Sequence, residues 1–279
     1  MGVVADQSAE LPGDRAGDER LGAVLEPLRT RYAYWLGLDE DQVLDDRDED
    51  PDQIRAMQLI LRMERNRTPS WHAALRLAAS GAARICLDDR VRTDPDWRAA
   101  ISAYARGHIR KVTRRGRGAQ WEATADLPQL TVQDGETEVR VMLPGLVSEL
   151  DKRVSKLQVG GTDAPVDEPP AAEPDELTLQ VWVPPEPVMT LGKTMAQTGH
   201  AGMIAAALLA DDHDALQRWN DAGCPSDVRR ASRDQWQSLT ERLADPLGGW
   251  QQDRLLAVRD AGFTEIAPGT VTVIARAPR

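Results

Sequence analysis

Apolar and polar positions alternate along this chain in a pattern that predicts strands and helices in turn. Short apolar runs predict strands, and longer stretches with apolar residues three or four positions apart predict helices. The predicted strands are residues 57–63, 108–118 (with a turn), 138–143, 177–183, 227–232, 255–260 and 270–277. The predicted helices are residues 21–38, 68–87, 94–107, 192–210, 215–223 and 234–245, and Thr68 is expected to cap the second of them, with Pro69 in its first turn. This alternation predicts an α/β fold in which small mixed β-sheets are flanked by helices.

Three segments of the first half resemble three segments of the second half, in the same order. QLILRM (58–63) resembles the strand at 177–183, and residues 108–123 resemble residues 226–238. VQDGETEV (132–139) resembles VRDAGFTEI (258–266) with one residue deleted. We therefore expect two tandem copies that form a pseudo-dimer within one chain. The alternative is chance, because any two α/β domains share such periodicities.

Composition divides the chain into four parts. Residues 1–50 are acidic, and the first twenty are expected to be disordered. Residues 160–176 are rich in Pro, Gly and acidic side chains, which is typical of a linker. They separate an expected domain at 51–159 from a second at 177–279. The chain start lacks the pattern of a secretory signal, no apolar run is long enough to cross a membrane, and the two cysteines lack zinc-finger spacing. These features predict a cytoplasmic protein with no membrane partner.

Charge is distributed unevenly along the chain. The net charge is −11, yet residues 51–125 hold 15 basic and 7 acidic side chains, a local net charge of +8. Local charge governs the attraction of phosphates, because salt screens charges beyond about 8–10 Å. Five basic side chains gather in one short stretch and are candidates for binding phosphates: Arg110, Lys111, Arg114, Arg115 and Arg117. The alternative is a solvated basic face, or one paired with the acidic tail.

The first block with candidate chemistry is LGKTMAQTGHA, residues 191–201. Lys193, Gln197 and His200 are spaced so that they share one helix face. Gly192 precedes the first turn, where backbone N–H groups and Lys193 can meet an anion. Periodicity alone favours the plainer alternative, in which Lys193 is a surface charge and His200 a core residue.

The second block is VRDAGFTEIAPGTVT, residues 258–272. A turn after a strand places Asp260 at a sheet edge, and Thr264 follows four residues later. A carboxylate and a hydroxyl held together on a turn can orient a water molecule and take its proton. The plainer alternative is that Asp260 only stabilises the turn.

Together, the two blocks resemble the type II (archaeal and eukaryotic class) peptidyl-tRNA hydrolase family. The resemblance rests on GK-x-x-AQ-x-x-HA at residues 192–201 and DAG-x-T-x-x-x-PG-T at residues 260–270, within residues 177–279. It implies metal-independent hydrolysis of the ester of peptidyl-tRNA without a cofactor. By matching position, Lys193, Asp260 and Thr264 are the implied catalytic residues, while Gly192, Gln197, His200 and Gly262 are the implied substrate-binding residues. The family also implies dimers, so we expect a monomeric pseudo-dimer or a homodimer.

The resemblance leaves other functions open. Many family members carry a basic or polar residue where Phe263 stands here, so the positive charge beside the turn is reduced. A module that binds tRNA or a protein without hydrolysis is one alternative, and hydrolysis of a related acyl ester or amide is another. In the first half, Asp134 and Thr137 echo Asp260 and Thr264, and Lys193 aligns with Ser70 or Trp71. We expect this copy to be inactive and to bind RNA through its basic cluster.

Overall fold

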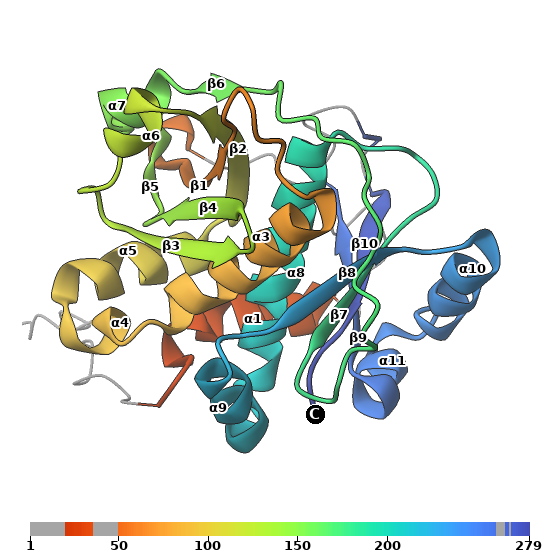
Figure 1. The fold of residues 1–279 in the computed structure, drawn as a ribbon. Helices are drawn as coiled ribbons and strands as arrows, with labels where there is room; N and C mark the ends of the chain where they lie inside the picture. Colours follow the sequence, from red (N-terminus) through yellow and green to blue (C-terminus); the bar gives the residue numbers. More distant parts are fainter. Residues whose placement is uncertain (1–19, 36–49, 261–265, 268) are drawn as a thin grey trace, which may run out of the picture.

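The computed structural model of the 279-residue chain describes residues 20–35, 50–260, 266–267 and 269–279. It contains two mixed β-sheets flanked by helices, as the hydrophobic pattern predicts (Figure 1). The first sheet has the strand order β3-β4-β1-β2-β6, and the short strand β5 also pairs with β1. Its strands are β1 (Arg55–Arg62), β2 (Arg110–Gly116), β3 (Gln129–Asp134), β4 (Thr137–Met142), β5 (Gly145–Leu146) and β6 (Gln158–Val159).

The second sheet repeats the strand order of the four main strands of the first. Its order is β8-β7-β10-β9, built from β7 (Leu179–Val183), β8 (Ser226–Arg230), β9 (Leu255–Arg259) and β10 (Val271–Arg276). The pair β7/β8 is parallel, as is β1/β2, and the other pairs of both four-strand sets are antiparallel. The connection between the parallel strands of each pair includes one long helix. These helices are α3 (Trp71–Leu87) in the first half and α8 (Leu191–Leu209) in the second.

The two long helices pack against each other between the two sheets (Figure 1). Each helix also contacts the sheet of the other half: α3 packs against β8, and α8 packs against β2. Gly202 of α8 allows the helices to approach closely, because a Cβ at this position would lie 2.1 Å from the carbonyl oxygen of Ala79 in α3. One continuous apolar core therefore includes residues of both halves.

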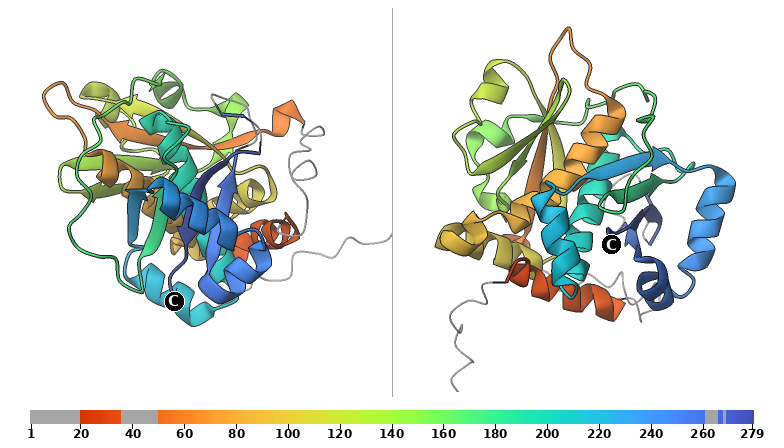
Figure 2. Two further views of the ribbon diagram at one scale, coloured as in Figure 1. Left: turned by 90° about the vertical axis from the view of Figure 1, so that its right-hand side faces the viewer. Right: turned by 60° about the horizontal axis from the view of Figure 1, so that its bottom comes forward.

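Smaller helices cover the outer surfaces (Figure 2). In the first half these are α1 (Glu26–Trp35), α4 (Arg90–Thr93), α5 (Pro95–Arg106), α6 (Ala119–Glu122) and α7 (Lys152–Ser155). In the second half they are α9 (His213–Asp221), α10 (Arg233–Arg242) and α11 (Pro246–Asp253). The described part of the first half also contains 3₁₀ turns at Ala23–Leu25, Pro51–Gln53 and Val147–Glu149. Tyr32 of α1 donates a hydrogen bond to the carbonyl of Ala257 and accepts one from its N–H group, so α1 satisfies the backbone of the edge strand β9. None of the helices in the described ranges is long and apolar enough to span a membrane.

Two local predictions need correction. Helix α3 begins at Trp71 with Ser70 as its cap, because the Ser70 hydroxyl accepts the N–H of Ala73; Thr68 and Pro69 precede the helix. Aligning the caps of α3 and α8 places Lys193 opposite Ala73, and not opposite Ser70 or Trp71. The strand β3 and the helix α11 were not predicted, because polar residues break the apolar run of β3 and α11 contains Pro and two Gly residues.

The acidic and Pro-rich segment between the halves is extended and makes specific contacts. Asp167 accepts hydrogen bonds from the backbone N–H of His72 (3.1 Å) and pairs with the His72 ring (2.8 Å) at the start of α3. Thr162 is almost fully buried beside Gly192 at the start of α8. The segment therefore passes over the N-terminal ends of both long helices. The predicted disordered residues 1–19 lie outside the described residues, and the domain boundaries at 51–159 and 177–279 remain a prediction.

The contact of Gly202 with Ala79 predicts a stability effect opposite to helix propensity. In an exposed helix, Gly→Ala stabilises by about 1 kcal/mol, whereas Gly202→Ala should lower the free energy of unfolding by about 1–3 kcal/mol because the helices must separate. Urea unfolding measures the change. Gly107→Ala is the matched control, since its nearest atoms lie at 3.8 Å and 3.9 Å. A Gly202→Ala protein as stable as the wild type would show that the helices do not pack this closely.

Candidate functional site

The first turn of α8 carries the residues of the first motif. Thr190 caps the helix, and its hydroxyl accepts the N–H of Lys193 at 3.3 Å. The helix is buried along nearly its whole length, but the Lys193 side chain is 12% exposed, so it remains in limited contact with solvent. The N-terminal end of α8 thus places the Lys193 ammonium group close to the surface.

Asp260 lies against this turn at the end of β9. Its side chain is only 6% exposed, and its Oδ2 atom accepts a hydrogen bond from the Lys193 ammonium group. Gln197, one helical turn beyond Lys193, donates a hydrogen bond from Nε2 to the same oxygen at 2.8 Å. The backbone of Asp260 is fixed as well, because its N–H bonds to the carbonyl of Thr270 (3.0 Å) and its carbonyl accepts the N–H of Gly269 (2.8 Å). The two motifs, 67 residues apart, therefore meet in one buried ion pair.

Thr272 of β10 orients this cluster, and sequence analysis missed it. Its hydroxyl donates a hydrogen bond to Gln197 Oε1 at 2.7 Å, and Thr272 is fully buried. An ionised carboxylate only accepts hydrogen bonds, so Gln197 must turn its NH₂ group to Asp260 and its oxygen to a donor. Thr272 supplies that donor. Its position two residues after the motif's last Thr, on the inner face of the final strand, was the only available signal.

The first half of the chain also contacts the start of α8. Thr113 of β2 donates a hydrogen bond to the carbonyl of Gly192 at 2.8 Å. A Cβ at Gly192 would lie 2.7 Å from the hydroxyl oxygen of Thr162. Gly192, predicted to face substrate, is thus required at least for the close approach of Thr162 and Thr113.

His200 lies on the same helix, beside a lysine from the first half. Lys111 of β2 places its ammonium group 3.5 Å from His200 Nδ1 and 3.3 Å from both the Tyr104 hydroxyl and the Ile109 carbonyl. Burial lowers the pKa of Lys111 to about 7. Burial, together with the charges of Lys111 and Lys193, holds the pKa of His200 well below its usual range, so His200 is neutral at pH 7. A neutral ring at this place can donate or accept a hydrogen bond.

The five predicted phosphate-binding residues do not form one surface. Lys111 is directed to the helix layer, as described above. Arg114 donates to Gln58 (2.7 Å) and to the carbonyl of Leu157 (2.8 Å), and Arg115 bonds to Gln158 and Gly161. Arg110 is partly buried, whereas Arg117 is exposed and lines a pocket. Strand alternation separates residues that are adjacent in sequence, so of this cluster Arg117 is the side chain placed most openly toward solvent.

The first half contains a counterpart of the ion pair. Asp134 ends β3 as Asp260 follows β9, and it pairs with Arg76 of α3. Thr137 stands opposite Asp134 in the hairpin, and its hydroxyl accepts the N–H of Ser70 at 3.0 Å. The residue opposite Asp260 is Thr270, so Thr137 corresponds to Thr270 and not to Thr264. Asp134 is 42% exposed, which distinguishes it from the buried Asp260.

Four residues of the second motif lie outside the described residues: Ala261, Gly262, Thr264 and Pro268. Phe263 lies outside them as well, and the roles predicted for Gly262 and Thr264 remain predictions. Within the described ranges, no three His, Cys, Asp or Glu side chains gather closely enough to hold a metal ion. Cys86 and Cys224 are both free and buried, and burial raises the pKa of each thiol to about 12.

The environment of Lys111 predicts a pH-dependent stability. Between pH about 7 and 10.5, Lys111 is mostly neutral in the folded chain but still protonated in the unfolded chain. The burial of Lys111 therefore lowers the free energy of unfolding by its full amount below pH 7, and by progressively less as the pH rises. Lys111→Met should therefore stabilise the protein most at pH 7, and its advantage over the wild type should shrink by up to about 1.4 kcal/mol per pH unit toward pH 9. Urea unfolding at three pH values measures this, with the exposed Lys156→Met as control. Parallel curves for Lys111→Met and the wild type would contradict it.

Comparison with known proteins agrees with the two motifs. Residues 180–279 match the family model described as Peptidyl-tRNA hydrolase PTH2. None of the curated proteins matches the chain. The matched range includes Lys193, Gln197, Asp260 and Thr272, the residues that form the buried cluster. Over residues 180–279, this chain is therefore similar to the peptidyl-tRNA hydrolase PTH2 family.

Proposed function

We propose that this protein hydrolyses the ester bond that joins a peptide to the 3′ end of tRNA, in the cytoplasm and without a metal. The observation that carries the proposal is the buried contact of Lys193 and Gln197 with Asp260, formed by residues of both family motifs. Support at the level of the family comes from the match of residues 180–279.

The chemistry requires a water molecule, a carbonyl group and a leaving ribose hydroxyl. The water oxygen attacks the ester carbonyl, the bond from carbon to the ribose oxygen breaks, and the ribose oxygen leaves with a proton. In the proposed mechanism Asp260 orients the water, takes its proton and returns that proton to the leaving ribose oxygen. Lys193 stabilises the negative charge that develops on the carbonyl oxygen, or holds a terminal phosphate. Thr264 fixes the carboxylate or the water.

The surroundings of the ion pair favour this assignment of roles. Asp260 and Lys193 are 6% and 12% exposed, and electrostatic interactions are stronger where water is largely excluded. Gln197 and Thr272 restrict the rotation of the carboxylate, so the reacting groups are positioned before substrate binds. His200 and Gly192 lie on the same helix and are proposed substrate contacts, together with Gly262.

We further propose that the two halves arose by tandem duplication and form a pseudo-dimer. The shared strand order, the shared parallel and antiparallel pairings and the Arg76–Asp134 pair support this interpretation. In this proposal the first half binds the RNA and the second half cleaves the ester.

The main alternative is a module that binds tRNA or a protein without hydrolysis. To distinguish this module from an enzyme, the purified protein is mixed with peptidyl-tRNA, and the release of free tRNA is measured. Binding without release would support the module, and neither binding nor release would point to another ester or amide substrate.

Lys193→Ala and Asp260→Asn should each lower kcat/KM for peptidyl-tRNA by on the order of 10²-fold or more, because each removes a charge from the reacting centre. The rate of tRNA release measures the effect, and thermal unfolding verifies that each variant is folded. Lys156→Ala and Asp234→Asn are matched controls, as both side chains are exposed. Near-normal turnover by either folded site variant would exclude the assignment.

Thr272→Val should lower kcat about tenfold with little change in KM, because Val fills the same space but cannot hold the Gln197 amide in place. Thr272→Ser should restore most of the rate. The buried Gln197 oxygen also loses its donor, so the free energy of unfolding should fall by about 1–3 kcal/mol. If Thr272→Val loses stability but keeps the wild-type kcat, Thr272 has a structural role only.

A further inference from the structure

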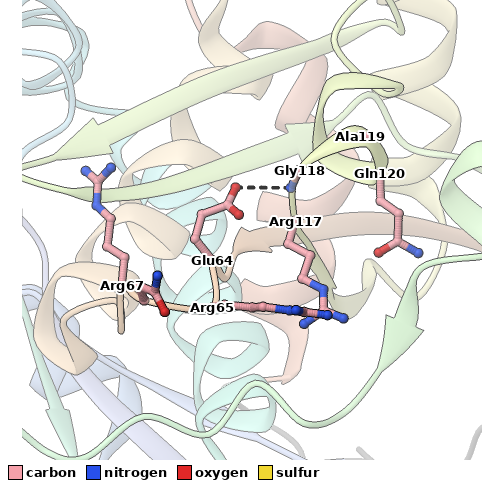
Figure 3. Close-up of a pocket in the computed structure, with 8 residues that line it drawn as sticks. Glu64, Arg65, Arg67, Arg117, Gly118, Ala119 and Gln120 are labelled. Carbon is pink, nitrogen blue, oxygen red and sulfur yellow. Dashed lines mark hydrogen bonds between the residues drawn. The ribbon is translucent and has the colours of Figure 1, made fainter.

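A basic pocket lies at the C-terminal ends of β1 and β2, outside the family-matched domain (Figure 3). Its volume is about 560 Å³. The side chains that carry its chemistry are Glu64, Arg65, Asn66, Arg67, Arg117 and Gln120. The lining contains three arginines and one glutamate, so its net charge is +2. Figure 3 shows Arg65 and Arg117 pointing toward the same edge of the pocket.

The Glu64 carboxylate in the pocket already accepts hydrogen bonds from other groups of the protein. Glu64 accepts the backbone N–H of Gly118 at 3.1 Å and the guanidinium of Arg62 at 3.0 Å. The bond from Gly118, followed by that from Arg62, holds the pKa of Glu64 below its usual range. Glu64 therefore stays ionised and bonded to these two groups, and neither of them is an arginine of the pocket.

Among the described residues, two of the three pocket arginines have no side-chain hydrogen bond or salt bridge. Arg67 lies 3.2 Å from the carboxylate of Glu136. The guanidinium groups of Arg65 and Arg117 make no hydrogen bond or salt bridge with any residue that the structure describes, and both residues are exposed. The positive charge of Arg117 also contributes to the lowered pKa of Glu64. Two guanidinium groups directed to one edge repel each other unless an anion lies between them. Guanidinium forks bind phosphate oxygens in bidentate geometry, which makes phosphate the best matching anion.

The position of the pocket relates it to the candidate active site. In the view of Figure 1, loop 63–70 and the N-terminal end of α8 both lie toward the top of the molecule. Thr113 of β2 touches Gly192, next to Lys193, and Arg117 follows four residues later along the same strand direction. At about 3.3 Å per residue of an extended strand, four residues span at most about 13 Å, so Arg117 is within that distance of Thr113 along the chain.

We propose that the pocket formed by Arg65, Arg67 and Arg117 binds the phosphodiester backbone of the substrate tRNA near its acceptor end. This inference rests on the proposed function, because it requires the ester to be held at Lys193 and Asp260. The pocket lining favours a nucleic-acid backbone over an acidic peptide, since it offers amide and guanidinium donors and only Ala119 as an apolar side chain. Asn66 and Gln120 supply further donors for phosphate or ribose oxygens.

The test compares tRNA binding by the full-length wild type and the double variant Arg65→Ala/Arg117→Ala. The probe is deacylated tRNA, and fluorescence anisotropy is measured at several salt concentrations. We expect affinity to fall about tenfold or more, and the slope of log K against log salt to become shallower by about 2, one unit for each lost phosphate contact. The control Arg218→Ala/Arg233→Ala removes two exposed arginines of α9 and α10 and should leave the slope unchanged.

A second substrate separates this inference from the proposed function. An N-acylaminoacyl ester of adenosine carries the scissile bond but no phosphate backbone, so the double variant should cleave it at the wild-type rate while its KM for peptidyl-tRNA rises. If the wild type cleaves neither substrate, the proposed function fails, while the tRNA-binding result still decides the role of the pocket. Wild-type affinity and salt slope in the double variant would overturn the inference. Loss of polyglutamate binding with unchanged tRNA binding would overturn it as well, and would assign the pocket to an acidic protein.

Discussion

The close packing of α3 against α8 is the constraint on which the rest of the structure depends. Each of these helices is covered by its partner and by a sheet on either side, so α8 has almost no solvated face. A helix that is buried on all sides must be apolar. It also needs small side chains where two backbones approach each other, as at Gly202 and Ala79. Between His200 and Leu209 every residue of α8 is Ala, Gly, Met, Ile or Leu. Polar chemistry is therefore confined to the first ten residues, where α8 approaches the surface and meets the end of β9.

The same packing explains why the first half contributes to a site whose motifs lie only in the second. Because α8 crosses to the first sheet, Thr113 and Lys111 of β2 lie against Gly192 and His200. The linker residue Thr162 completes this contact. The start of the proposed catalytic helix thus contacts β2 and the linker, both of which lie outside residues 180–279, as well as Asp260 at the end of β9. A change in β2 or in the linker would alter the position of Lys193 without altering either motif.

The sequence predicts this molecule best where a pattern is local. Most strands and long helices follow from apolar spacing, and the meeting of Lys193, Gln197 and Asp260 follows from the two motifs together. Prediction from the sequence fails where tertiary contacts decide which of two local conformations or caps forms. Ser70 caps α3 in place of Thr68 because Thr137 of the adjacent hairpin binds its backbone N–H. In the sequence, Thr272 is indistinguishable from other β-branched residues of a strand. No local signal indicates that its hydroxyl bonds to Gln197, which lies 75 residues earlier in the chain. The arrangement of the basic cluster could not be predicted for a related reason: the side chains alternate along β2, and Arg114 and Arg115 bond to Gln58 and Gln158.

The two halves share a topology, but their electrostatics differ at the corresponding helix ends. At the start of α3 the linker carboxylate of Asp167 already accepts the N–H of His72, so an anion of the chain itself lies where a helix N-terminus attracts negative charge. At the start of α8 the neighbours are the neutral hydroxyls of Thr113 and Thr162, together with Lys193. The carboxylates differ as well, because Asp134 is 42% exposed and Asp260 only 6%. A charge that develops on a substrate would be screened by water beside Asp134, whereas beside Lys193 it would meet a cation in a largely dry environment. In the proposed division of labour, this difference in burial and local charge leaves hydrolysis to the second half, while the first half presents the exposed Arg65 and Arg117 to the tRNA.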